Sequence, residues 1–346
     1  MNVLINYSKD FGGAEYCSLS LAQRFSRYSG DELYYCSYKS IPSENESVWI
    51  KKNIFFVFFL LKNFKKINCI FLVNTLSAVY APFLKILGYR LVYLMHDDYS
   101  KQTKKRKFCY RIGQLFSDIV VFPCRYSLSS VEHIDGPNKI VAYNKFNIAP
   151  KSVSVPFVHK QVRVLNVGRV EENKNQLLTL EIAALLKEKL DLSTVNVVFL
   201  GSVTDECYKN SLLQFASEKQ LIISFESCDK NDVDLYYSSA DLVLHTSNIE
   251  CLPSVLIESV LAGVLVFSTN VGGASEILPT EFILESKEVE VNANIIEKRL
   301  LDLVASEDNR RNFRKEYTTL QTSIYNKFCS SANDKEIYEL IQGGKS

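Results

Sequence analysis

Apolar and polar positions along the chain alternate between two periods. Short apolar runs, typical of buried strands, are separated by longer segments in which apolar residues recur at helical spacing. The runs predict strands at residues 3–5, 69–73, 91–95, 119–122, 162–167, 195–200, 221–225, 242–245 and 264–268. Helical spacing predicts helices at 14–25, 54–66, 175–189, 207–218 and 253–261, and a charged helical tail from about residue 297.

Alternating strands and helices favour an α/β fold, with parallel sheets covered by helices on both faces. The pattern stops in a Pro- and Ser-rich stretch at 145–160 and then restarts. We therefore expect two similar α/β domains, 1–150 and 151–325, followed by a helix at 326–346.

The size and charge of the chain agree with two domains. A length of 346 residues and a hydrophobic content of 47% suffice for two cores. The net charge of +1 hides an asymmetry, because residues 1–150 carry 20 Lys and Arg against 11 Asp and Glu, whereas 151–346 carry 20 against 28. The basic half is expected to face an anionic partner.

The nine cysteines are scattered, and no Cys-x-x-Cys or Cys/His cluster occurs. This is typical of reduced thiols in a cytoplasmic protein without structural zinc. The first residues predict a strand rather than a signal peptide. The longest apolar run, 54–61, is far shorter than the roughly 20 residues that cross a bilayer.

Several polar or glycine-containing segments directly follow predicted strands: Gly12-Gly13, His96, Gly168-Arg169, 247–250 and Gly272-Gly273. Ligands of open parallel sheets bind outside the carboxyl ends of the strands. We therefore expect these segments to converge on a cleft between the two domains.

Glu250 and Glu258 carry the strongest chemical signal. Pro253 favours the first turn of a helix, which puts Glu250 in the preceding loop and Glu258 on the helix among apolar neighbours. A carboxylate in such surroundings needs a partner or a cleft. Two acids flanking a helix start that can bind an anion would suit a nucleoside diphosphate sugar. The alternative is a solvent-facing helix with scattered acids.

Arg169 and Lys174 follow Gly168 in the loop after strand 162–167. Two cations in this position can neutralise a diphosphate, although a solvated loop with ordinary surface charges is the alternative. Gly12-Gly13 would allow close approach of a phosphate, or would only form a turn. Neither G-x-G-x-x-G nor a P-loop occurs, which argues against an NAD enzyme or an ATPase.

His96 ends an apolar strand and can donate a hydrogen bond to a sugar hydroxyl. Asp97 or Asp98 can orient an acceptor or serve as a weak base. The alternative is that these residues only cap the strand end. A metal site is not expected, because no third ligand lies nearby in the sequence.

Two basic segments also invite interpretation. For 54–66 we favour a core helix with lysines at its ends. Six cations between Lys101 and Arg111 predict a surface patch that suits an anionic membrane. No nucleic-acid motif accompanies this patch, so we expect no nucleic-acid partner.

Taken together, these residues resemble the retaining glycosyltransferases of family 4, which have the GT-B fold of two Rossmann-like domains facing a cleft. The resemblance covers nearly the whole chain. It is carried by these segments: Ala240–Ser247, Glu250-x7-Glu258, Ala262-Gly263, Gly272-Gly273, Glu276, Gly168-Arg169 with Lys174, Gly12 to Glu15, and His96-Asp97.

The resemblance implies a role for each site residue. Arg169 and Lys174 would hold the diphosphate, Glu250 the donor sugar and Glu258 the ribose. Backbone groups at Leu252, Pro253 and Ser254 would bind sugar and phosphate beside Gly168. His96 would touch the sugar, and Gly13 would approach the phosphate or the acceptor. The first domain would bind the acceptor, the second the nucleotide sugar, and the last helix would return to the first domain.

The implied activity is transfer of a hexose or N-acetylhexosamine to a saccharide or lipid-linked saccharide during assembly of a bacterial surface polysaccharide. The donor would be a UDP-sugar rather than a GDP-sugar, and neither a metal nor another cofactor would be needed. The protein would be cytoplasmic. The basic first half and the cluster of cations between Lys101 and Arg111 add the hypothesis of peripheral contact with an anionic membrane. Cys251 and Leu265 replace the usual glycine and proline of the family. The alternatives are therefore an inactive GT-B partner subunit or a nucleotide-sugar epimerase.

Overall fold

The computed structural model describes residues 1–6, 13–37, 48–51, 54–136, 138–155, 160–229, 232–285, 287–331 and 334–343. Gly12 and residues 156–159 of the predicted linker lie outside the described residues. The chain divides into two compact units. Unit 1 comprises Met1–Phe146 and Ser330–Ser346, and unit 2 comprises Asn147–Cys329.

Unit 1 is built on a parallel sheet of seven described strands in the order β3-β2-β1-β4-β5-β6-β7. The strands are β1 (Asn2–Asn6), β2 (Leu33–Ser37), β3 (Val48–Lys51), β4 (Cys69–Val73), β5 (Leu91–Leu94), β6 (Ile119–Phe122) and β7 (Asn138–Val141). The described side chains of β1, β4, β5 and β6 are buried throughout, as expected for strands covered on both faces.

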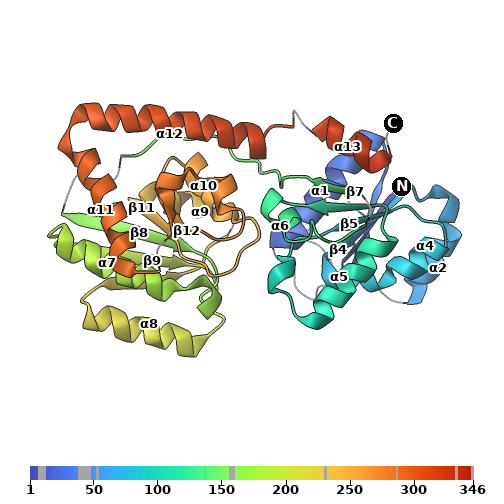
Figure 1. Ribbon diagram of the computed structural model, residues 1–346, viewed down its shortest axis with the longest axis horizontal. Helices are drawn as coiled ribbons and strands as arrows, with labels where there is room; N and C mark the ends of the chain where they lie inside the picture. The colour runs from blue at the N-terminus through green and yellow to red at the C-terminus, as the bar shows by residue number, and fades with distance from the viewer. Residues whose placement is uncertain are drawn as a thin grey trace. The chain divides into compact units, whose positions relative to one another are not determined.

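Helices cover both faces of this sheet (Figure 1). They are α1 (Gly13–Ser29), α2 (Ile54–Lys62), α3 (Asn74–Ser77), α4 (Ala81–Ile86), α5 (Lys104–Phe116), α6 (Arg125–Ser129) and α13 (Asp334–Gln342), with 3-10 turns at Phe64–Lys66, Ala78–Tyr80 and Tyr99–Lys101.

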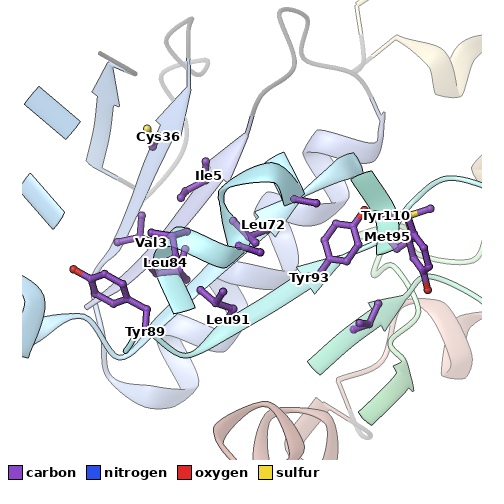
Figure 2. Close-up of a cluster of buried hydrophobic side chains, with 14 of the residues drawn as sticks. Val3, Ile5, Cys36, Leu72, Leu84, Tyr89, Leu91, Tyr93, Met95 and Tyr110 are labelled. Carbon is purple, nitrogen blue, oxygen red and sulfur yellow. Dashed lines mark hydrogen bonds between the residues drawn. The ribbon is translucent and has the colours of Figure 1, made fainter. Parts of the chain in front are cut away.

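Two apolar clusters form the core of unit 1. Figure 2 shows the first, in which Leu72 and Tyr93 from the sheet pack with Leu84 of α4 and Tyr110 of α5. The second cluster joins the opposite face of the sheet to α1 and α13.

Unit 2 repeats this plan with the described strand order β10-β9-β8-β11-β12-β13, again all parallel. The strands are β8 (Gln161–Val167), β9 (Thr194–Leu200), β10 (Ile222–Glu226), β11 (Leu242–His245), β12 (Leu265–Thr269) and β13 (Ile283–Leu284). Its helices are α7 (Gln176–Lys189), α8 (Glu206–Glu218), α9 (Val233–Ser239), α10 (Ser254–Leu261), α11 (Val289–Ala305) and α12 (Glu307–Phe328), with 3-10 turns at Glu172–Lys174, Ala274–Glu276 and Thr280–Phe282.

In both sheets the first strand of the unit lies inside the sheet. The chain adds the next strands toward one edge, then returns and adds the remaining strands toward the other edge. In each unit the first strand lies between the second and the fourth, which is the doubly wound Rossmann-like order. The predicted α/β class with parallel sheets is therefore confirmed for both units.

Some predicted elements differ from those found. Edge strands β3 and β7, central strand β2 and helix α5 were not predicted, because short or polar segments give a weak apolar pattern. The predicted helix 54–66 divides into α2 and a 3-10 turn at Phe64–Lys66. Our interpretation of it as a core helix was wrong for Phe58 and Leu61, which are exposed, although Leu60 is buried.

Pro253 is the N-cap of α10 rather than part of its first turn. Among the residues that the structure describes, no helix has both the length and the apolar character that crossing a bilayer requires.

Candidate functional site

The candidate site of unit 2 lies where the strand order of its sheet reverses. Strands β8 and β11 are neighbours, and the chain leaves them in opposite directions across the sheet. At such a switch point the loops after the two strands separate and leave room for a ligand. These loops carry Gly168 to Asn175 and Thr246 to Pro253.

Buried polar side chains join the two loops. The amide of Asn166 on β8 donates to Thr246 Oγ1 at 3.2 Å and to Thr179 Oγ1 at 2.9 Å. The Thr246 hydroxyl in turn faces the carbonyls of Lys174 and Asn175 at 3.1 and 2.9 Å. Because Asn175 has a left-handed backbone (φ 49°), the chain turns sharply there and α7 begins at the next residue.

This arrangement brings together two residues that are 76 positions apart. The Nζ of Lys174 forms an ion pair with Oε1 of Glu250. Gly168, at φ +152°, lies under the aliphatic part of Lys174, and a Cβ there would touch this chain at 3.5 Å. Both charged side chains are about four-fifths buried. Each charge therefore requires the opposite charge of the other to offset its loss of hydration.

His245 is a third member of this cluster. Its Nδ1 lies 3.0 Å from Ser268 Oγ, whose hydroxyl donates to the Thr269 carbonyl at 2.8 Å. Nε2 lies 3.5 Å from Glu250 Oε1. The imidazole ring therefore lies between Ser268 and the carboxylate of Glu250, within reach of both.

The surroundings of Glu250 set its charge. Burial by itself raises the pKa of Glu250, but the hydrogen bond from His245 and the charge of Lys174 outweigh it and lower the pKa to about 2. Glu250 is therefore a carboxylate at neutral pH and can only accept hydrogen bonds.

A glycine loop supports the segment after Glu250. The backbone N–H of Gly273 donates to the Cys251 carbonyl at 2.7 Å. At Gly272, which has φ +55°, a Cβ would lie 2.5 Å from the Glu250 carbonyl oxygen. Only glycine fits here without displacing the loop. Leu252, Pro253 and Ser254 then lead directly into α10.

Glu258 occupies the second turn of α10 and has a partner that sequence analysis missed. The hydroxyl of Tyr237 on α9 donates to Glu258 Oε2 at 2.9 Å. Tyr237 is buried, and burial together with the charge of Glu258 raises its pKa well above the ordinary value. The tyrosine therefore remains a hydrogen-bond donor at any physiological pH and orients the carboxylate.

Arg169 differs from Lys174 in its environment. Its guanidinium forms an ion pair with Glu171 at 3.2 Å, and 62% of its side chain is exposed. The structure thus joins Lys174 directly to Glu250, whereas Arg169 has a nearby acidic partner in its own loop.

The remaining predicted residues belong to unit 1. His96 follows β5, and its Nε2 lies 2.7 Å from Ser18 Oγ on α1, the helix that begins at Gly13. Burial lowers the pKa of His96 to about 4, so the imidazole is neutral at neutral pH and can act as a hydrogen-bonding group without charge.

Asp98 does not fit the suggested role of weak base. It is buried, and its carboxylate accepts hydrogen bonds from the Ser100 backbone at 2.8 Å, the Ser100 hydroxyl at 2.6 Å and the Tyr126 hydroxyl at 2.8 Å. These bonds make Asp98 the cap of the turn before α5.

Sequence analysis did not single out His245, Thr246 or Tyr237 as functional residues. A histidine at the end of a buried strand, five residues before Glu250, was the available signal for His245. Nothing in the local sequence pairs Tyr237 with Glu258. Within the described ranges, no group of three His, Cys, Asp or Glu residues is placed to hold a metal ion.

Comparison with known proteins bears on the family of unit 2 and on the fold of the whole chain. Residues 148–319 match the family described as glycosyl transferases group 1, and this segment covers almost all of unit 2. Unit 2 therefore has the sequence pattern of the glycosyl transferases of group 1.

Two solved structures show the fold of the whole chain. HepE from Anabaena, in complex with UDP-glucose, has a TM-score of 0.80 and 18% identity, with 99% of each chain covered. A glycosyltransferase from Rickettsia africae has a TM-score of 0.78 and 16% identity, again with 99% of each chain covered. The protein has the GT-B fold.

One relative in sequence is the capsular polysaccharide biosynthesis glycosyltransferase CapH of Staphylococcus aureus. It is 26% identical over 187 residues, which make up 52% of this chain. The matched segment spans about half of that relative, 51% of its length.

Proposed function

We propose that this protein is a retaining glycosyltransferase that moves a sugar from a nucleoside diphosphate sugar to a saccharide or lipid-linked saccharide. The observation that carries the proposal is the Lys174–Glu250–His245 cluster at the switch point of unit 2. The group 1 match of the same unit supports it. The complex of HepE with UDP-glucose supports a nucleotide-sugar donor, with UDP favoured over GDP.

The donor would occupy the loops after β8 and β11. Lys174 and Arg169 neutralise the diphosphate, and the backbone N–H groups at the start of α10 add hydrogen bonds to it. The carboxylate of Glu250 accepts hydrogen bonds from hydroxyls of the donor sugar. Glu258, oriented by Tyr237, accepts those of the ribose.

Charge compensation explains why Lys174 and Glu250 are paired before a donor binds. Each would otherwise be a buried, uncompensated charge. When the diphosphate arrives, Lys174 turns to it, and Glu250 keeps its contact with His245. The departing diphosphate then develops its charge beside a cation already in place, which favours the transition state.

The acceptor would bind in unit 1, where the neutral His96 can hydrogen-bond a sugar and Gly13 begins α1. The capsular role of CapH supports assembly of a bacterial surface polysaccharide as the process. The transferred group would be a hexose or an N-acetylhexosamine. We propose a cytoplasmic location, and no metal or other cofactor besides the donor.

Thermal unfolding with UDP-, GDP- and ADP-sugars tests donor binding, because a ligand that binds only the folded state raises the melting temperature. We expect the largest rise with a UDP-sugar.

Replacing Lys174 by Ala should lower turnover roughly 100-fold or more, because the cation acts on developing charge. Arg169→Ala should also lower turnover.

Lys219→Ala is the matched control, because Lys219 is exposed at the end of α8. It should keep wild-type turnover and the same rise in melting temperature. If Lys174→Ala transferred sugar as fast as this control, the assignment would be wrong. If no nucleotide sugar raised the melting temperature, the proposed donor class would have to be abandoned.

A further inference from the structure

The basic excess of the first 150 residues is confined to one segment. Residues 54–117 carry eleven Lys and Arg against two Asp and no Glu, whereas the rest of 1–150 carries nine of each sign. This segment includes helices α2, α4 and α5 of unit 1, together with strands β4 and β5. Of its two acids, Asp98 is buried and hydrogen-bonded within its own turn.

The same segment also exposes large apolar side chains. Of the 21 large hydrophobic residues exposed in the described ranges, ten lie between residues 58 and 116. The most exposed are Ile86 on α4 at 83%, and Leu115 and Phe108 on α5 at 70% and 65%. A soluble monomer rarely concentrates exposed apolar groups in this way unless they serve for binding.

On α5 the two kinds of side chain share one stripe. Lys104, Phe108, Arg111 and Leu115 recur at intervals of four, three and four residues, and all are exposed. They therefore lie on one side of the helix, in an order that alternates cation and bulky apolar group. The opposite side of α5 is buried and includes Tyr110.

Helices α2 and α4 extend this surface, because they cover the same apolar cluster as α5. Leu60 of α2 belongs to the same cluster as Leu84 of α4 and Tyr110 of α5, and Figure 2 shows the last two. The Tyr89 hydroxyl also bonds the Leu60 carbonyl at 2.7 Å. We name the outward side of the three helices the α2–α5 surface, represented by Phe58, Ile86, Lys104, Phe108, Arg111 and Leu115.

The side chains of the α2–α5 surface indicate which kind of partner it can bind. The centre of a protein–protein interface is depleted in lysine. Single-stranded nucleic acid stacks its bases on aromatic rings, and the exposed aliphatic side chains of Ile86 and Leu115 offer no such ring. An anionic bilayer attracts Lys and Arg to its headgroups and takes Phe, Leu and Ile into the boundary of the acyl chains.

We propose that the α2–α5 surface docks unit 1 on an anionic lipid bilayer. The cations contact the lipid headgroups, and Ile86, Phe108 and Leu115 enter the interface. This proposal identifies the residues of the membrane contact and stands on unit 1 alone. It does not depend on the donor chemistry proposed for unit 2, so the two can fail separately.

Co-sedimentation of the full chain with vesicles tests the proposal. We expect binding to phosphatidylcholine vesicles that contain phosphatidylglycerol, little binding to phosphatidylcholine alone, and weaker binding at high salt. The double variant Lys104→Gln/Arg111→Gln should lower the partition coefficient roughly 25-fold, about fivefold for each cation. Phe108→Ser/Leu115→Ser should also lower binding and leave the melting temperature unchanged, because both side chains are exposed.

Matched controls come from exposed residues of unit 2. Lys298→Gln/Lys315→Gln makes the same change of charge, and Leu213→Ser/Leu235→Ser also replaces two exposed large apolar side chains by serine. Both should bind vesicles like wild type. The proposal is overturned if wild type ignores anionic vesicles, if it binds phosphatidylcholine equally well, or if controls and surface variants lose binding equally. A dimer in vesicle-free solution that the surface variants dissociate would overturn it too.

Discussion

At the scale of the residue, the cluster around Glu250 shows how neighbours determine a charge. A carboxylate as buried as this one would ordinarily be harder to ionise. Lys174 and His245 reverse that tendency, and the pKa falls to about 2. The same two contacts fix the orientation of the side chain, so ionisation and position have one cause.

Acid stability should therefore depend on Glu250. Its pKa lies below the ordinary value of 4.5, so its stabilising effect is fully present above about pH 4.5 and is lost as the pH falls toward 2. Between these values, thermal unfolding should show a steeper loss of stability for wild type than for Glu250→Gln. Glu188→Gln, which alters an exposed side chain of α7, should follow wild type. Parallel profiles for wild type and Glu250→Gln would contradict the assignment.

At the scale of the element, α10 depends on its neighbours for position. On one side Tyr237 of α9 holds Glu258. On the other, the Gln321 side chain of α12 donates to the Val260 carbonyl at 2.9 Å and the Lys151 carbonyl at 3.0 Å. These bonds hold an eight-residue helix in place at the edge of the candidate site.

Tyr237→Phe should weaken donor binding while leaving the fold intact. The ring still fills its buried position, but Glu258 loses a hydrogen bond. Bonds to charged groups contribute about 1.5–3 kcal/mol, so we expect the donor dissociation constant to rise roughly tenfold in calorimetric titration. Tyr325→Phe removes a hydroxyl from a partly exposed ring of α12 and should have no effect. Equal affinity of Tyr237→Phe and wild type would show that the bond does not serve binding.

At the scale of the whole molecule, the end of the chain belongs to the unit in which the chain begins. Helix α13 packs on α1, where Tyr338 meets Phe25 edge to face with ring centroids 6.0 Å apart. Asp334 forms an ion pair with Arg24 at 2.9 Å and lies 4.0 Å from Lys145. Unit 1 is thus completed by a segment that follows unit 2 in the sequence.

Asp334→Asn should destabilise unit 1 selectively. It leaves two largely buried cations without their carboxylate, and losing one partner of such a pair costs roughly 3 kcal/mol. Calorimetry should show the unfolding transition of unit 1 shifted several degrees downward and that of unit 2 unchanged. Lys335→Gln, which alters an exposed neighbour, serves as the control. An unshifted transition would mean that the apolar packing of α13 stabilises unit 1 without the Asp334 ion pair.

The local pattern of apolar and polar residues alone predicted many of the strands and helices of this molecule. Short apolar runs located β4, β6 and β11 at their observed bounds, because buried strands must be apolar wherever they pack. The spacing of Pro253 and the two glutamates also placed Glu250 in a loop and Glu258 on a helix, since backbone rules act over a few residues.

Only the tertiary structure decided which distant side chains meet. The sheet order makes β8 and β11 neighbours, and this brings Lys174 to Glu250 across 76 positions. It also sets His245 against the same carboxylate and Tyr237 against Glu258. Such pairings follow from strand order and burial, which no local period encodes. The charge of each group then depends on those neighbours, so the chemistry of the site emerges only once the chain has folded.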